Sequence, residues 1–298
     1  MTLAQTAPDT AHRRGVFLVA GAATIWSTSG LVARLISADP WTMAFYRAGF
    51  ASLFLIAYLA WRDRSRFGAS FVAAGWAGLA VGCCFAATTI LFVLSISLTK
   101  VANTLILQSL SPLIAALLGW VLLGERVRPR TWMTIFAAVA GVVVMMANAI
   151  ATGSIVGDLL ALIIAFAFAT ATVLIRRSKA VRMTPAAAMG TAIAMLVALA
   201  WAQPLSVAAA DLPLLFIFGA CQLGLGMALF TAGARLVPAA ETSLLAILET
   251  VLAPIWVWLL LGETPTGLVL VGGGIVLTAL VAHTLLDARD ARAFGMRL

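Results

Sequence analysis

Two stretches of the sequence, residues 102–126 and 240–264, repeat one pattern of residues. They read ANTLILQSLSPLIAALLGWVLLGER and AETSLLAILETVLAPIWVWLLLGET, and a shift of 138 positions superposes them without a gap. Both contain the ending Leu-Leu-Gly-Glu, and the same shift also carries Leu91-Phe92 onto Leu229-Phe230. An internal repeat determines the architecture of the whole chain. We therefore predict that the chain consists of two related halves that arose by duplication.

The composition excludes a water-soluble domain. Of the 298 residues, 63% are hydrophobic and 10% are charged, and the mean hydropathy is +1.09. Soluble domains carry roughly a quarter of their residues as charged side chains. The apolar runs are continuous, whereas the strands of a membrane barrel alternate apolar and polar residues. The sequence therefore predicts an all-α integral membrane protein whose surroundings are the lipid bilayer.

Ten apolar runs are long enough to span a membrane as helices. The connections between them are short, so no extramembrane domain is expected. We place the runs at about residues 15–36, 41–61, 71–97, 102–123, 131–149, 156–175, 184–204, 212–236, 240–261 and 267–286.

The basic residues follow alternate loops. All of the 19 Lys and Arg residues except Arg34, Arg47 and Lys100 fall on one side of the predicted spans. Such a bias marks the cytoplasmic face, so we predict a multi-pass protein of the inner (cytoplasmic) membrane with both termini in the cytoplasm. The same distribution explains the net charge of +8 without a nucleic-acid partner.

The repeat and the span count together predict an inverted duplication. Each half holds five spans, an odd number, so the second half enters the membrane upside down relative to the first. The predicted units are a cytoplasmic tail at 1–14, a first repeat at 15–149, an inverted second repeat at 150–286 and a cytoplasmic tail at 287–298. Inverted repeats are typical of transporters whose substrate site lies between the halves near the membrane midplane. We therefore expect a central cavity.

These features resemble the drug/metabolite transporter superfamily, and specifically its EamA-like family. The resemblance rests on the five-plus-five duplication and the two Leu-Leu-Gly-Glu endings. It also rests on the segment 25–28 (Ile-Trp-Ser-Thr), Arg47, Pro112 and Glu249. The similarity implies a secondary carrier that exports small metabolites, and the Trp-Ser-Thr stretch resembles the aromatic amino acid exporters of this superfamily. One departure is Thr250, where many relatives have proline; here the proline is Pro254.

Polar residues on predicted spans four and nine indicate a cavity wall. Thr104, Gln108 and Ser111 share one helical face, and the repeat maps this face onto that of Thr242 and Glu249. Polar side chains within a membrane span face protein or a water-filled cavity. The alternative is that they only hold neighbouring helices together. Of this set, Gln108, Ser111, Thr242 and Glu249 are candidate cavity residues.

Glu249 is the only acidic residue near the middle of a predicted span. One hypothesis is that it couples transport to protons or pairs with a substrate amine. The alternative is a protonated or hydrogen-bonded carboxyl group that fixes the ninth span.

An aromatic group with hydroxyls lies near the middle of predicted span one. An offset of 142 pairs Trp26 with Phe168 and Thr28 with Thr170 in span six. Rings with a few hydroxyls suit a substrate that carries an aromatic ring, although Trp26 could also simply pack between helices. The remaining candidates for the cavity wall are Ser27, Thr88, Thr89 and Gln222.

Arg47 and two prolines receive structural interpretations. Arg47 is expected to extend toward the outer membrane surface. Pro112 and Pro254 interrupt helical hydrogen bonding and are candidate hinges for alternating access, or else static kinks.

No motif for catalysis, ATP hydrolysis, metal binding or a cofactor is present, so we predict neither an enzyme nor a cofactor. The cysteines at 83, 84 and 221 lie inside apolar runs without metal-ligand spacing. The expected function is export of amino acids, aromatic ones favoured, with a small-molecule substrate as the partner. The alternatives are an exporter of drugs or amphiphiles and a structural membrane subunit. The sequence does not fix an oligomeric state and is compatible with a monomer.

Overall fold

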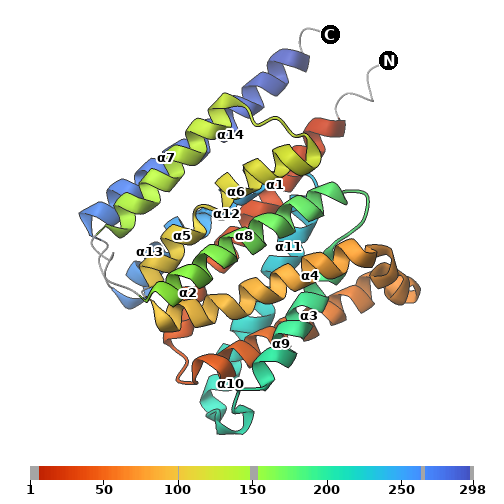
Figure 1. Ribbon diagram of the computed structural model, residues 1–298, viewed down its shortest axis with the longest axis vertical. Helices are drawn as coiled ribbons and strands as arrows, with labels where there is room; N and C mark the ends of the chain where they lie inside the picture. Colours follow the sequence, from red (N-terminus) through yellow and green to blue (C-terminus); the bar gives the residue numbers. More distant parts are fainter. Residues whose placement is uncertain (1–6, 100, 148–153, 263–265, 296–298) are drawn as a thin grey trace.

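The chain folds entirely into helices and turns in the part that the structure describes. The computed structural model describes residues 7–99, 101–147, 154–262 and 266–295 (Figure 1). The α-helices are α1 Ala7–Trp26, α2 Ser29–Arg34, α3 Pro40–Asp63, α4 Phe67–Leu98, α5 Val101–Gln108, α6 Ser111–Leu123, α7 Pro129–Met146, α8 Ile155–Arg177, α9 Thr184–Leu199, α10 Leu212–Phe216, α11 Leu225–Ala234, α12 Ala239–Ala246, α13 Leu248–Leu261 and α14 Gly267–Gly295. Three short 3-10 helices, η1 Arg64–Arg66, η2 Pro204–Ser206 and η3 Ala209–Asp211, and one π-helix, η4 Ile217–Gly224, complete the set.

Six helical stretches in the described part are long and apolar enough to cross a membrane. They are Thr10–Ala33, Pro40–Leu98, Asn103–Leu123, Ile155–Arg177, Ala209–Ala234 and Ala239–Leu260. The second of these contains both α3 and α4, which are joined by the short η1 turn. Three shorter apolar helices overlap predicted runs that these six do not cover. They are Pro129–Val144, Thr184–Leu199 and Gly267–His283. The all-helical class is therefore confirmed for the described residues.

The first and last helices extend beyond the predicted apolar runs. Helix α1 begins at Ala7, inside the segment 1–14 that was predicted to be a tail, and α14 continues to Gly295. Hydropathy locates the part of a helix that lipid can surround. It does not locate the polar turns that continue the same helix into water.

Three predicted spans are divided by short interruptions. Helix α1 gives way to α2 at Ser27-Thr28, α5 to α6 at Ser109-Leu110, and α12 to α13 at Ile247. The prolines were expected to mark such sites. Pro112 does follow the second interruption, in the first turn of α6, whereas Pro254 lies inside the continuous helix α13.

The helix packing keeps the same pattern when the first half of the chain is exchanged with the second. Helix α4 packs on α8 and α9, and correspondingly the η4–α11 segment packs on α1 and α3. The pairs α3·α9 and α7·α14 each join corresponding helices of the two halves, and α6·α12 joins the second part of predicted span four to the first part of predicted span nine. Figure 1 shows α7 and α14 side by side along one edge of the molecule. Corresponding segments of the two halves therefore make corresponding contacts.

The two Leu-Leu-Gly-Glu endings have the same backbone geometry. Gly124 and Gly262 end α6 and α13 with φ of 66° and 71°, in the left-handed region that glycine adopts readily. In each case the glycine N–H donates to the carbonyl of the equivalent tryptophan, Trp120 or Trp258, at 3.0 Å. The sequence repeat is thus a structural repeat at this point.

Small residues hold the helices together. Most of the buried side chains of α8 and α9 are alanine, glycine or threonine. A Cβ added to Gly190 would lie 2.6 Å from the carbonyl oxygen of Gly82, so α4 and α9 approach at backbone contact. Such close approach is how helices associate in lipid, where apolar surface alone gives no driving force.

Candidate functional site

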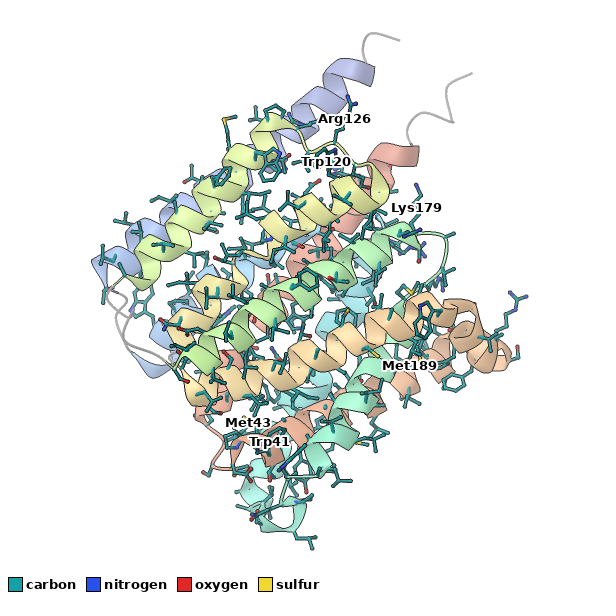
Figure 2. The ribbon with its side chains drawn as sticks, in the orientation of Figure 1. Trp41, Met43, Trp120, Arg126, Lys179 and Met189 are labelled. Atoms are coloured by element: carbon teal, nitrogen blue, oxygen red, sulfur yellow. The ribbon has the colours of Figure 1, made fainter. Side chains whose placement is uncertain are left out.

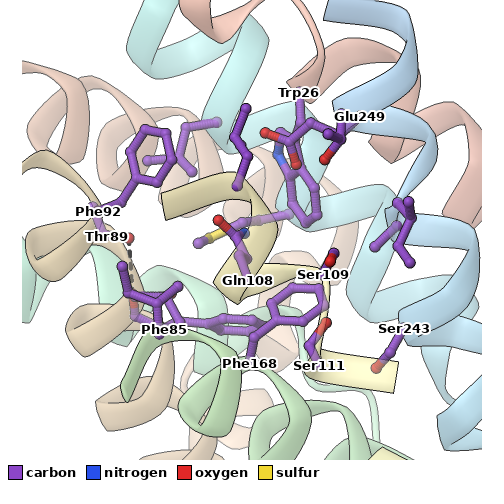
Figure 3. A pocket seen from close by; sticks show the side chains of 18 of the residues that line it. Trp26, Phe85, Thr89, Phe92, Gln108, Ser109, Ser111, Phe168, Ser243 and Glu249 are labelled. Carbon is purple, nitrogen blue, oxygen red and sulfur yellow. Dashed lines mark hydrogen bonds between the residues drawn. The ribbon is translucent and has the colours of Figure 1, made fainter. Parts of the chain in front are cut away.

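A cavity lies where the two halves of the chain meet. Its volume is about 90 Å³, enough for several water molecules but below the roughly 300 Å³ at which typical ligand pockets begin. Both halves contribute to the wall, and Figure 3 shows several of these side chains around the same space. The lining residues are Trp26, Arg47, Phe85, Thr88, Thr89, Phe92, Leu105, Gln108, Ser109, Ser111, Ile164, Phe168, Leu223, Met227, Ser243, Ala246, Ile247, Glu249 and Thr250.

Two helix interruptions at corresponding positions of the repeat border this cavity. Ser109 and Ile247 are related by the offset of 138, and both line the wall. Pro112 has no N–H to donate to the carbonyl of Gln108, which ends α5 at this point. Discontinuous helices in equivalent positions of two repeats are a mark of transporter binding sites. The interruptions therefore single out this cavity as the candidate site.

An aromatic cluster forms one wall. The ring centroids of Trp26 and Phe168 lie 6.4 Å apart, and each packs on Phe230 behind them, at 5.4 and 5.0 Å. A Cβ on Gly226 would collide with the Trp26 ring nitrogen, so only glycine leaves room for this ring position. The wall offers apolar and aromatic surface to a ligand.

Arg47 lies in the cavity wall and not at the membrane surface. Its side chain is buried, with 6% of its surface exposed. Its guanidinium carbon lies 4.4 Å from the ring centroid of Phe218, and Nη2 donates a 3.2 Å hydrogen bond to Oε1 of Gln222. The prediction that Arg47 extends outward is therefore wrong. Its position along α3 gave no sign that Phe218 and Gln222, some 170 residues later, would surround it.

Gln222 fixes Arg47 from the π-helix η4. Besides accepting from Arg47, its Nε2 donates to the backbone carbonyl of Trp26 at 3.0 Å. This amide therefore joins the end of α1, helix α3 and η4. A π-helix widens the backbone by one residue per turn and is frequent at functional sites. Gln222 supports the cavity wall and does not line it.

Glu249 faces the cavity from the first turn of α13. It interacts electrostatically with Arg47, yet among the described residues no ion pair within 4.0 Å joins the two side chains. The cavity thus holds one basic and one acidic group without direct contact. Opposite charges in a region of low dielectric constant attract more strongly than in water.

Several polar atoms of the wall have no hydrogen-bond partner among the described residues. They are Nε1 of Trp26, Nε of Arg47, Oε1 of Gln108 and Oγ of Ser243. Buried polar groups are normally paired because an unpaired one costs free energy. These four atoms have almost no exposed surface in this structure, so they can pair with water or a ligand only where the cavity widens.

The predicted site residues divide into two sets. The cavity brings together Trp26, Thr88, Thr89, Gln108, Ser111, Phe168 and Glu249. It does not include Ser27, Thr28, Thr170, Gln222 or Thr242. Ser27 accepts a 2.7 Å hydrogen bond from Nε1 of Trp256 on α13, and the hydroxyls of Thr28 and Thr170 bond to carbonyls of their own helices.

Sequence reasoning missed several wall residues. Ser109 and Ser243 could have been found, because they lie beside predicted site residues on the repeated stretch. Phe85, Phe92 and Met227 carry no sequence signal, since apolar residues in a membrane span look alike. In the described ranges, no group of three or more His, Cys, Asp or Glu residues is placed to hold a metal ion.

Comparison with known proteins decides the family. The model of the EamA-like transporter family matches the chain twice, over residues 13–147 and 155–284. The chain belongs to the EamA-like transporter family. The resemblance inferred from the sequence is thereby confirmed at the level of the family and of the drug/metabolite transporter superfamily. This EamA-like protein is a multi-pass membrane protein and a transporter of small molecules.

The fold has a solved counterpart. A structure titled "Crystal structure of protein" matches with a TM-score of 0.77 and 18% sequence identity, over 92% of this chain and 98% of that one. At this identity the match establishes the fold alone. A search of the curated proteins finds no match, so the aromatic exporter resemblance stays a prediction.

One end of this EamA-like transporter, which we call the basic end, carries Glu125, Arg176 and Arg235. Arg176 Nε donates to Glu125 Oε1 at 2.8 Å, and Arg176 Nη1 donates to the carbonyl of Arg235 at 3.1 Å. The second oxygen of Glu125 accepts from the backbone N–H of Ala239 at 3.4 Å. Figure 2 places Arg126 and Lys179 toward this end and Trp41 toward the other. The bonds of Glu125 tie the end of α6 in the first half to α8 and α12 in the second, and the bond from Arg176 to Arg235 ties α8 to the end of α11.

The opposite end is also closed by contacts between the halves. The hydroxyl of Tyr46 donates to the carbonyl of Pro204 at 2.9 Å, and the backbone N–H of Gln203 donates to the hydroxyl of Thr42 at 2.8 Å. Asp39 begins α3 as its N-cap. Partial burial raises the pKa of the Asp39 carboxyl, but hydrogen bonds from Thr42 and Trp41 outweigh it, so the pKa lies below its usual value.

Proposed function

We propose that this EamA-like protein is a secondary carrier that exports amino acids, aromatic ones favoured, across the inner membrane. The observation that carries the proposal is the cavity between the two halves. It combines an aromatic wall, formed by Trp26 and Phe168, with an acid and a base, Glu249 and Arg47. An amino acid with a ring presents matching groups.

The proposed mechanism is alternating access, in which the two halves rock about the cavity. It includes ten membrane spans, an inverted second repeat and cytoplasmic termini at the basic end. Support comes from the charge bias of the loops, the exchange pattern of the helix packing and the paired helix interruptions. Because the cavity of about 90 Å³ is smaller than typical ligand pockets, the cycle must include a wider state. Substrate or proton gradients would supply the free energy.

An exporter of drugs or amphiphiles is the second candidate. It is favoured by the apolar share of the wall, including Leu105, Ile164, Leu223 and Met227. Methionine side chains adapt to ligands of different shape. Such a carrier would accept neutral and cationic amphiphiles as readily as zwitterions.

Counterflow in proteoliposomes tests the proposed function. Vesicles that hold purified protein are loaded with one unlabelled amino acid and diluted into a trace of the same labelled one, without ATP. We expect transient accumulation for L-phenylalanine or L-tryptophan, and none in protein-free vesicles. Accumulation of only lipophilic cations would favour the drug exporter. Absence of flux across all amino acids and amphiphiles tried would support a structural subunit and overturn the proposal.

A further inference from the structure

The guanidinium group of Arg47 is incompletely satisfied by the protein. It carries five N–H donors, of which one bonds to the neutral amide of Gln222. Its Nε has no hydrogen-bond partner among the described residues. Only 6% of the residue's surface is exposed. Burying a charge is costly unless it is paired and hydrogen-bonded. A ring contact and one amide oxygen leave most of this requirement open.

The compensating charge, Glu249, is near but not in contact. Both residues line the same cavity and interact electrostatically, without an ion pair within 4.0 Å in the described structure. A ligand with a negative group toward Arg47 and a positive group toward Glu249 would satisfy both charges at once.

We propose that Arg47 binds the carboxylate of the substrate and Glu249 its ammonium group, so that the cavity selects zwitterionic amino acids. The inference rests on the proposed transport function and names the two groups that read the substrate. The guanidinium fork of arginine matches the two oxygens of a carboxylate. The rings of Trp26 and Phe168 then receive the substrate's side chain, and the free Oγ of Ser243 and Oε1 of Gln108 are further hydrogen-bonding groups for its polar end.

Gln222 acts here as a positioning residue. It holds the Arg47 side chain by one of its outer nitrogens, Nη2, and leaves Nε and the other donors for the ligand. Its own second bond, to the Trp26 carbonyl, couples the carboxylate-binding group to the aromatic wall. A change in one is therefore expected to displace the other.

The test uses ligands that differ only in charge. Labelled L-phenylalanine counterflow into proteoliposomes is competed with unlabelled L-phenylalanine, phenylalaninamide, which lacks the carboxylate, and 3-phenylpropionate, which lacks the ammonium group. In the unaltered protein, we expect the zwitterion to compete at least tenfold better than either analogue. Loss of a charge-assisted interaction of this kind corresponds to about 10- to 100-fold in affinity.

Variants assign each charge to its residue. Arg47→Gln is expected to weaken competition by the zwitterion about 10- to 100-fold and to leave competition by phenylalaninamide unchanged. Glu249→Gln is likewise expected to weaken competition by the zwitterion, but to leave competition by 3-phenylpropionate unchanged. Arg47→Lys keeps the charge without the fork and should fall between. Arg62→Gln, at the far end of the same helix α3 and paired with Asp63, is the matched control.

Each outcome decides the inference. If Arg47→Gln weakens all three ligands by the same factor, Arg47 is structural and the proposal is overturned. Because the readout is a ratio between ligands within one variant, partial loss of folded protein does not alter it. If Arg47→Gln gives too little folded protein to measure, the ratio in Arg47→Lys decides. If phenylalanine counterflow is unchanged by these substitutions, only the charge assignment is overturned. If no amino acid is transported at all, the proposed function itself is overturned.

Discussion

Arg176 and Glu125 join the two halves of the chain at the basic end, with 2.8 Å between Nε and Oε1. Glu125 comes directly after Gly124, the left-handed end of α6. Its two oxygens reach α8 through Arg176 and the first turn of α12 through Ala239. For the carrier to open at this end, these bonds must break. The pair therefore favours the state in which the basic end is closed.

Removing this pair should shift the conformational equilibrium. In Glu125→Gln we expect the ratio of closed to open protein to fall by up to about fivefold, since a partly exposed pair contributes about 1 kcal/mol at most. Spin labels at positions 126 and 179, in a background without native cysteines, would report a longer distance between these sites. Asp63→Asn is the control because it breaks an ion pair between neighbouring residues of one segment. An unchanged distance distribution in Glu125→Gln would show that other contacts hold this end closed.

Gly226 should tolerate no side chain while Trp26 keeps its place. A methyl group there collides with the Trp26 ring, so Gly226→Ala is expected to lower stability by about 1–3 kcal/mol and to weaken substrate binding. Combining it with Trp26→Phe, which removes the colliding ring atoms, should restore part of the stability. Gly274→Ala, where a Cβ meets no atom within 4 Å, should be neutral in the same thermal unfolding assay. Equal effects of the two alanine variants would contradict the packing argument.

The family and the duplication could be read from the sequence, but Arg47 could not. A repeat of 138 positions and long apolar runs are local features that survive without knowledge of packing. The surroundings of Arg47 depend on Phe218 and Gln222, which reach it through the π-helix η4. The periodicity of the sequence does not predict the π-helix, which has one more residue in each turn than an α-helix.

The wall of the candidate cavity was predictable only in part. Gln108 and Glu249 line it and stood out as polar residues in apolar spans. Thr242 and Ser27 stood out equally, yet both serve helix contacts: Thr242 is fully buried and Ser27 bonds to Trp256. A polar residue in a span faces protein or cavity, and only the three-dimensional arrangement distinguishes the two.

Gln222 allows two substitutions with opposite expectations. Gln222→Leu removes the acceptor for Arg47 and the donor to the Trp26 carbonyl, so we expect a loss of stability of about 1–3 kcal/mol. Gln222→Glu places a carboxylate beside Arg47, which should preserve stability but compete with a substrate carboxylate and weaken phenylalanine affinity about tenfold. Thermal unfolding and counterflow of the two variants would separate support of the wall from ligand binding. Tighter phenylalanine binding in Gln222→Glu would contradict the role given to Arg47.

The two Leu-Leu-Gly-Glu endings should label from opposite sides of the membrane. The proposed inversion of the second repeat would place position 125 in the cytoplasm and position 263, which lies outside the described residues, on the outer face. Single cysteines are introduced at these positions in a variant that lacks the native cysteines. In intact cells that express these variants, the two positions should differ in their reaction with an impermeant maleimide. Position 263 should react at once and position 125 only after the cells are broken. Reaction of both from the same side would exclude inversion and the rocking mechanism with it.

Proton coupling through Glu249 predicts a separation between two kinds of transport. If Glu249 loads and releases the coupling proton, Glu249→Gln should abolish accumulation driven by a pH gradient, because glutamine cannot ionise. Counterflow driven by the substrate gradient should continue in the same vesicles, at the lower affinity expected from the lost ammonium partner. Glu241→Gln serves as control, since this buried carboxyl pairs with His12 at 3.3 Å and does not line the cavity. An undiminished response of Glu249→Gln to the pH gradient would restrict Glu249 to binding the substrate.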